Sequence, residues 1–233
     1  MLTLAIDTAV NFCSTCLWDD ATDRILSREE RDIGRGHAEQ LMQTVEVVMH
    51  NAGVDYADLG RIAVAVGPGS FTGIRVGVAA ARGFGLALGI PVVGVTTLAV
   101  LAADAAGEAS GPFAVVVKGG RGQLFMQHFD VAGDPLDDIV ALDEVAAPGA
   151  IRSDARLLVG DAAAAVAEAL GATGRRLIPA HVDRATGAIE TVARLSATAP
   201  HPPVPLYLRD ADARPQQGFV LPRAATAGRE KAR

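Results

Sequence analysis

Residues 64–89 read VAVGPGSFTGIRVGVAAARGFGLALG, and this stretch is the most informative part of the chain. It continues Arg61–Val66, a short apolar segment rich in β-branched side chains, which is typical of a strand buried in a parallel sheet. The tripeptide GPG at 67–69 ends that strand, and we predict a helix from about Ser70 to Gly89. A strand that leads directly into a helix is the repeating unit of an α/β fold.

Small residues recur every four positions in this predicted helix. A glycine within a helix costs about 0.5–1 kcal/mol relative to alanine, so four of them cost about 2–4 kcal/mol. A row of small side chains offsets such a cost when it lets another backbone approach closely. We therefore predict a contact surface, either against the chain's own sheet or against another chain; packing within the chain alone is the competing interpretation. The row is Gly73, Gly77, Ala81, Gly85 and Gly89, beside an apolar ridge of Val76, Ala80, Phe84 and Leu88.

The glycine-rich turn does not match the enzyme loops that it superficially resembles. A nucleotide-binding P-loop needs a lysine, and residues 67–77 contain none. A nucleophile elbow needs glycine two residues before and after the serine, but Ser70 has Pro68 and Thr72 there. The spacing after Gly69 also excludes a dinucleotide fingerprint. Free amides at the helix start could hold an anion, which is a capacity and not an activity.

Strand and helix patterns alternate on both sides of this unit. Strands are predicted at 2–7, 12–19, 24–31, 61–66 and 92–95, and helices at 37–52, 70–89 and 98–106. The order β-β-β-α-β-α-β-α is that of one half of the actin-like fold shared by sugar kinases, Hsp70 and actin. We therefore predict an α/β, actin-like (ASKHA, ribonuclease H-like) fold.

The rest of the chain is shorter and less regular. Residues 107–112 mark a boundary, followed by paired strands at 113–117 and 124–130, a strand at 156–159, and helices at 161–170 and 185–197. The predicted organisation is an N-terminal subdomain over 1–106, a reduced second subdomain over 107–210, and a poorly ordered tail over 211–233.

Composition restricts the class of protein. Half of the 233 residues are hydrophobic, so a sizeable core is expected, and aromatic residues make up only 4%. The formal net charge is −6 with scattered arginines, which disfavours unaided binding of a nucleic acid. We recognise no signal peptide at the start, and the apolar run at 83–95 is broken by Pro91. A soluble cytoplasmic protein is expected.

Few residues are candidates for metal or redox chemistry. Cys13 and Cys16 lie in a predicted strand, where residues three apart point to opposite faces, so a structural role is expected for both. His37 begins a predicted helix, but the residue four positions later is Leu41 and not a second ligand. We therefore predict no metal and no cofactor, and a packing or capping role for His37.

The turn sequence GPGSFTGIRVG at 67–77 resembles the hallmark of the TsaB (YeaZ) family. Other family landmarks occur in the same order along the chain. They are LAIDT at 4–8, HAEQL at 37–41, VGVTTL at 93–98 and PLYLR at 205–209. The match is close in the first half and looser in the second, and it implies an actin-like fold of two subdomains, the second reduced.

The resemblance also implies a function. TsaB-like proteins are non-catalytic subunits that work with the catalytic subunit TsaD and the ATPase TsaE to transfer a threonylcarbamoyl group to the adenosine beside the anticodon of tRNA. The resemblance implies a homodimer when the chain is alone, and contact with tRNA only through the complex. It further implies that the two long helices of the first half form the pairing surface. The predicted partner-interface residues are His37, Leu41, Val45, Val48, Gly73, Val76, Gly77, Ala80, Ala81 and Phe84.

Two features weigh on this prediction. The family's usual Asp-Ala-Arg stretch is replaced by Lys118-Gly119-Gly120-Arg121, so we transfer no function to these residues. Asp7 occupies the place of the metal-phosphate acid of actin-like phosphotransferases, but the reduced second subdomain favours a structural or vestigial role. The alternative function is an actin-like nucleotide-dependent enzyme or a glycoprotease-like metalloprotein.

Overall fold

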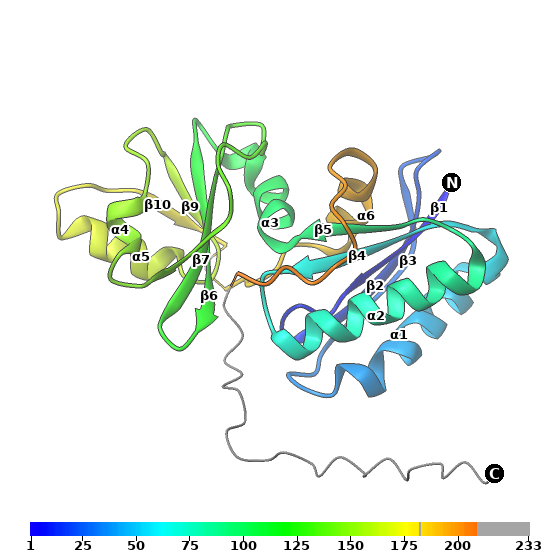
Figure 1. Ribbon diagram of the computed structural model, residues 1–233. Coiled ribbons are helices and arrows are strands. Elements are labelled where there is room, and N and C mark those ends of the chain that lie inside the picture. The colour runs from blue at the N-terminus through cyan, green and yellow to red at the C-terminus, as the bar shows by residue number, and fades with distance from the viewer. Residues whose placement is uncertain (182, 209–233) are drawn as a thin grey trace, which may run out of the picture.

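Two five-stranded sheets, joined by a helix between them, organise the part of the chain described by the computed structural model, residues 1–181 and 183–208 (Figure 1). The first sheet has the order β3-β2-β1-β4-β5. Its strands are β1 (Leu2–Asp7), β2 (Phe12–Asp19), β3 (Arg24–Asp32), β4 (Leu59–Gly67) and β5 (Val92–Thr96). The first three pair antiparallel, and β4 and β5 add on in parallel to β1.

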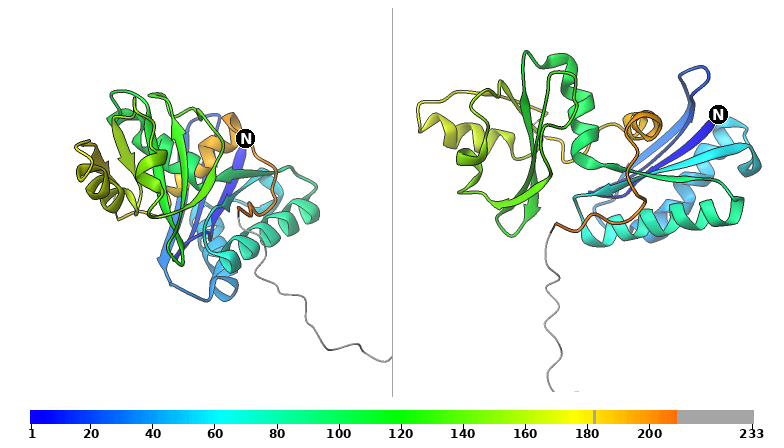
Figure 2. Two further views of the ribbon diagram at one scale, coloured as in Figure 1. Left: turned by 60° about the vertical axis from the view of Figure 1, so that its left-hand side comes forward. Right: turned by 45° about the horizontal axis from the view of Figure 1, so that its top comes forward.

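Helices cover both faces of the first sheet. α1 (His37–Ala52) and α2 (Phe71–Leu88) lie side by side on one face, and α6 (Ile189–Thr198) lies on the other (Figures 1 and 2). The strand residues alternate accordingly: Leu4 and Ile6 belong to the core under α1 and α2, and Ala5 belongs to the core under α6. Both faces are therefore apolar, as expected for a sheet enclosed by helices.

The second sheet has the order β10-β9-β6-β7-β8. Its strands are β6 (Phe113–Gly120), β7 (Gln123–Phe129), β8 (Val140–Asp143), β9 (Leu157–Val159) and β10 (Ile178–Ala180). α4 (Ala147–Ala150) and α5 (Ala163–Gly171) close one face. α3 (Thr97–Ala105) packs on the other face and so lies between the two sheets (Figure 2). Short 3₁₀ turns occur at Tyr56–Asp58 and Ala106–Glu108.

The predicted α/β, actin-like fold class is confirmed. All strands and helices predicted over residues 2–106 are present within a few residues of the expected bounds. The short elements β8, α4 and β10 were not predicted, because segments of three or four residues are too short to show periodicity. The division at residue 106 stays a prediction, and the predicted tail over 211–233 lies outside the described residues.

The last helix begins later than predicted. The sequence pattern suggested a helix from residue 185, whereas α6 begins at Ile189 and residues 183–188 form a loop. Asp104 of α3 accepts hydrogen bonds from the Ala188 amide and the Thr191 hydroxyl, so the helix start is capped by a side chain 84 residues away. The chain thus returns to the first sheet, and residues 201–208 run beside β5 to the start of α2 (Figure 2).

α2 is long and apolar enough to cross a membrane by length and composition alone. Its inner side, however, packs against the first sheet through Ile74, Val78 and Ala81. In this structure α2 is the outer layer of an α/β unit.

Candidate interaction surface

The parallel pair of helices α1 and α2 forms the predicted interaction surface, and local signals set both helices. α1 is followed by Gly53 in the left-handed conformation, whose amide donates to the carbonyls of Met49 and His50. α2 begins after Ser70, whose hydroxyl accepts a hydrogen bond from the Gly73 amide at 3.3 Å. Gly89, also left-handed, ends α2. These caps explain why both helices begin and end close to the predicted residues.

The glycine row of α2 faces the chain's own sheet. The Thr8 hydroxyl, just after β1, donates to the Gly73 carbonyl at 2.8 Å. A β-carbon on Gly73 would lie 2.0 Å from the Thr8 carbonyl oxygen, and one on Gly77 would lie 2.4 Å from the Thr8 hydroxyl oxygen. The close approach that the glycines permit is thus between α2 and the end of β1. We considered two contact partners for the row, the chain's own sheet and another chain, and the structure shows the sheet in contact with it.

This placement corrects most of the predicted interface residues. Seven are buried beneath the helix pair, so their side chains do not reach a partner chain; the remaining three are half-buried on the side of α2 nearest α1. The pattern had identified the apolar side of each helix, and that side belongs to the core of the first sheet. The buried residues are His37, Leu41, Val45, Val48, Gly73, Gly77 and Ala81, and the half-buried ones are Val76, Ala80 and Phe84.

His37 has the packing role that we expected. Its Nε2 atom lies 2.8 Å from the Val10 carbonyl oxygen, which joins the start of α1 to the turn between β1 and β2. Leu41 belongs to the hydrophobic core. Among residues 1–181 and 183–208, no group of three or more His, Cys, Asp or Glu side chains could hold a metal ion.

A different set of residues forms the outer face of the helix pair. Arg75, Ala79, Arg82 and Leu86 follow one another at helical spacing along the exposed side of α2. Leu86 is 87% exposed, and Phe71 at the start of α2 is 56% exposed. Met42 adds an exposed apolar side chain on α1. We call Met42, Phe71, Arg75, Ala79, Arg82 and Leu86 the outer face. The sequence pattern did not single it out, although α2 is apolar on nearly every side.

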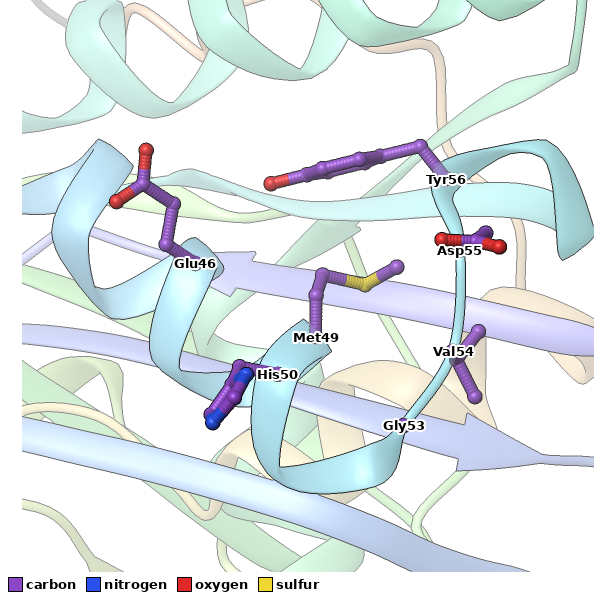
Figure 3. Close-up of a pocket in the computed structure, with 7 residues that line it drawn as sticks. All are labelled: Glu46, Met49, His50, Gly53, Val54, Asp55 and Tyr56. Atoms are coloured by element: carbon purple, nitrogen blue, oxygen red, sulfur yellow. The ribbon is translucent and has the colours of Figure 1, made fainter.

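A hollow of about 410 Å³ lies at the C-terminal end of α1 (Figure 3). Glu46 and Tyr56 project into it from opposite sides, above Met49. Tyr56 also stacks on Phe84 of α2 with ring centroids 5.8 Å apart, so the hollow lies next to α2. Burial, followed by the negative charge of Glu46, raises the pKa of Tyr56, and its hydroxyl stays protonated at neutral pH. The hollow therefore presents carboxylates, a hydroxyl and the imidazole of His50.

Asp7 links the first strand to the loop before α6. One carboxylate oxygen accepts from the Ala9 amide at 2.7 Å, and the other accepts from the Thr186 hydroxyl at 2.7 Å. The side chain is buried, and this burial raises the pKa of Asp7. A second hollow, of about 320 Å³, opens near Thr186 between the β1–β2 turn, β3 and residues 183–190. Because both carboxylate oxygens bond within the chain, Asp7 acts as a structural link.

Asp7→Asn is expected to fold and Asp7→Ala to lose about 2 kcal/mol or more of unfolding free energy, because asparagine keeps an acceptor for the buried Ala9 amide and alanine leaves that amide and the half-buried Thr186 hydroxyl without their acceptor. A raised folded-state pKa means that the wild-type chain loses stability as the pH rises from about 4, where the unfolded carboxyl ionises, through that pKa. The stability of Asp7→Asn relative to wild type should therefore increase with pH. Urea unfolding at several pH values measures both effects; equal losses for the two variants would contradict the structural role.

The cysteines point to opposite faces of β2, as predicted. Cys13 Sγ lies 3.7 Å from the Thr44 hydroxyl of α1, and Cys16 Sγ lies 3.6 Å from the Ile189 carbonyl of α6. Both thiols are free and buried, and burial raises the pKa of each. A raised pKa suppresses the reactive thiolate. These cysteines are structural.

The hairpin at 118–122 departs from the family pattern, and we assigned it no function. The Lys118 amide donates to an Asp161 carboxylate oxygen at 2.8 Å, which ties β6 to the segment after β9. Arg121 and Gly122 have positive φ angles at the tip of the turn between β6 and β7. The hairpin thus has a defined place in the second sheet.

Comparisons with known proteins agree with this architecture. Residues 30–179 match the family model described as TsaD: tRNA N6-adenosine threonylcarbamoyltransferase. The chain is 36% identical over 105 residues to the tRNA threonylcarbamoyladenosine biosynthesis protein TsaB of Escherichia coli (strain K12), covering 45% of this chain and 44% of that protein. It is 31% identical over 213 residues to an uncharacterized protein of Mycobacterium tuberculosis (strain ATCC 25618 / H37Rv), covering 91% and 93%. The match to the first of these spans less than half of that protein's length.

Solved structures show the same fold. YeaZ from Pseudomonas aeruginosa superposes with a TM-score of 0.71 at 22% identity, covering 89% of this chain and 99% of that one. A second structure from that organism, described as an uncharacterized protein with similarity to peptidase YEAZ, superposes with a TM-score of 0.72 at 23% identity. At these identities the likeness concerns the fold.

Proposed function

The chain belongs to the TsaB (YeaZ) family, and from this premise we propose that it is a non-catalytic subunit of the machinery that forms threonylcarbamoyladenosine in tRNA. The observation that carries the proposal is the outer face of the helix pair, which is largely apolar and, apart from the contact of Tyr207 with Phe71 and Arg75, uncovered by the described part of the chain. Exposed apolar side chains that gather on one face are typical of a protein interface.

The proposed partner is a TsaD-type catalytic subunit, joined by a TsaE-type ATPase. In the absence of these partners the same outer face pairs two copies of this chain. The net charge of −6 makes independent binding of tRNA unfavourable, so tRNA is contacted through the complex. A role in tRNA modification places the chain in the cytoplasm.

The non-catalytic role is supported by the state of the groups that catalysis would need. His37 contacts a backbone carbonyl and is followed, one turn later, by a core leucine, so the helix start lacks the pair of ligands at positions i and i+4 that a metal site would need. The carboxylate of Asp7 is engaged by Ala9 and Thr186. The alternative of an actin-like nucleotide-dependent enzyme would require Asp7 to leave these partners.

Reconstitution with the TsaD-type and TsaE-type proteins of the same organism tests the proposal. Modified nucleoside in tRNA is expected only when this chain is included, and this chain alone should produce none. Size-exclusion chromatography of this chain mixed with the TsaD-type subunit should give one co-eluting species. Full modification without this chain, or two species that stay separate, would overturn the proposal.

A further inference from the structure

Three side chains form an ordered cluster at one end of the outer face. The Arg75 guanidinium lies over the Phe71 ring, with its central carbon 3.7 Å from the ring centroid, and 5.4 Å from the Tyr207 centroid. The Arg75 Nε–H donates to the Tyr207 hydroxyl at 2.7 Å. The two rings are themselves in contact, with centroids 5.6 Å apart. Phe71 and Tyr207 are 56% and 48% exposed, so the cluster is held in place at the surface.

The arrangement leaves the outer edge of the guanidinium available. Within residues 1–181 and 183–208, Arg75 forms one hydrogen bond, and it uses only the Nε–H. The two terminal nitrogens carry four further N–H groups in the plane that matches a carboxylate. Because stacking and the Nε bond already restrict the side chain, binding at this edge loses less conformational entropy than binding to a free arginine.

The two segments that contact Arg75, α2 and the chain around Tyr207, carry no acidic residue within the described part of the chain, although the net charge of the chain as a whole is −6. α2 contains two charged residues, Arg75 and Arg82, and neither the turn at 67–70 nor the segment at 200–208 contains Asp or Glu. The Leu206 amide ties the segment to the end of β4 by donating to the Val66 carbonyl at 2.9 Å, and Tyr207 reaches α2. The segments that hold Arg75 thus bring no negative charge to it, and its guanidinium attracts an anion.

We propose that the Arg75 guanidinium, held between Phe71 and Tyr207, binds the carboxylate of an Asp or Glu side chain on the protein partner that covers α2. This inference rests on the proposed function, and it names the polar contact that orients the partner on an otherwise apolar face. Binding of RNA would need more cations than the two on α2, and the exposed Leu86 on the same side of α2 fits a protein surface. An arginine stacked on aromatic rings is also typical of residues that dominate binding energy.

The test is titration calorimetry of the full chain with the TsaD-type subunit at low and high salt. Arg75→Ala should weaken binding by about 30-fold, since a charge-assisted hydrogen-bonded pair is lost. The affinity of Arg75→Lys should lie between those of wild type and Arg75→Ala, because lysine keeps the charge and lacks the planar guanidinium. Arg176→Ala is the control, because Arg176 is an exposed arginine after α5 and outside the outer face, and it should change the affinity by less than about 3-fold.

Salt dependence and folding separate the outcomes. Arg75→Ala should also flatten the dependence of affinity on salt, and thermal unfolding should show that the variant folds. Tyr207→Phe removes only the hydrogen bond from the Arg75 Nε–H, so it tests that bond without detaching residues 201–208. Its loss of partner affinity should be smaller than that of Arg75→Ala. Equal effects of Arg75→Ala and Arg176→Ala, or a loss of tRNA affinity by the complex with unchanged partner affinity, would overturn the inference alone. No binding by the wild-type chain would overturn the proposed function as well.

Discussion

Gly73→Ala is expected to destabilise the protein by about 3 kcal/mol or more, although alanine is the better helix former. The added β-carbon would lie 2.0 Å from the Thr8 carbonyl oxygen. That oxygen belongs to the backbone at the end of β1, so neither partner can move aside by changing a rotamer. α2 would have to withdraw from the sheet, with loss of the bond from the Thr8 hydroxyl to the Gly73 carbonyl. Urea unfolding followed by circular dichroism measures the change.

Gly83→Ala is the matched control, on the same helix and with the same chemical change. A β-carbon at Gly83 meets no atom within 4 Å, and the residue is exposed. The substitution should therefore stabilise the protein by about 0.5–1 kcal/mol through helix propensity alone. If Gly73→Ala instead had the same unfolding free energy as wild type and lost only its affinity for the partner, the glycine row would belong to the interface.

The second large effect is expected on the outer face. Leu86→Glu should weaken association with the TsaD-type subunit by about 100-fold or more, because it places a charge on the most exposed apolar side chain of the proposed contact. Leu86 is 87% exposed, so the fold should tolerate the change. Analytical ultracentrifugation of the mixture measures the association, and thermal unfolding checks the fold.

Val145→Glu is the control for this experiment. Val145 is 94% exposed and lies beyond β8, on the second sheet's side of the molecule. The same apolar-to-acidic change at this position should leave association within about 3-fold of wild type. Comparable losses for the two variants would show that added negative charge, and not the outer face, governs binding.

Most of the fold could be predicted from local patterns. The strands around Leu4, Cys16 and Val64 are continuous apolar or alternating segments, and the two long helices end at glycines that take the left-handed conformation. The start of α6 could not be predicted in this way, because its cap is Asp104, which lies in another helix. The short strands β8 and β10 depend on pairing with β7 and β9 and have little signal of their own.

The candidate surface, like the fold, could be predicted only in part. Periodicity correctly placed Gly73, Gly77 and Ala81 on one side of a helix, and the helix pair remains the proposed interface. It also selected contact residues of which seven are buried, since the apolar side of α1 and α2 covers the first sheet. The outer residues Phe71 and Leu86 look unremarkable in a helix that is apolar on nearly every side.

The sequence by itself determined that the small residues of α2 share one side and that some backbone must approach it closely, because helical spacing and the cost of glycine are local properties. Only the tertiary structure decided that this backbone is the end of β1. The Thr8–Gly73 contact joins residues 65 apart, and the Arg75–Tyr207 contact joins residues 132 apart. Such contacts depend on how the sheet and the returning chain are arranged in space. The periodicity of α2 contains no information about that arrangement.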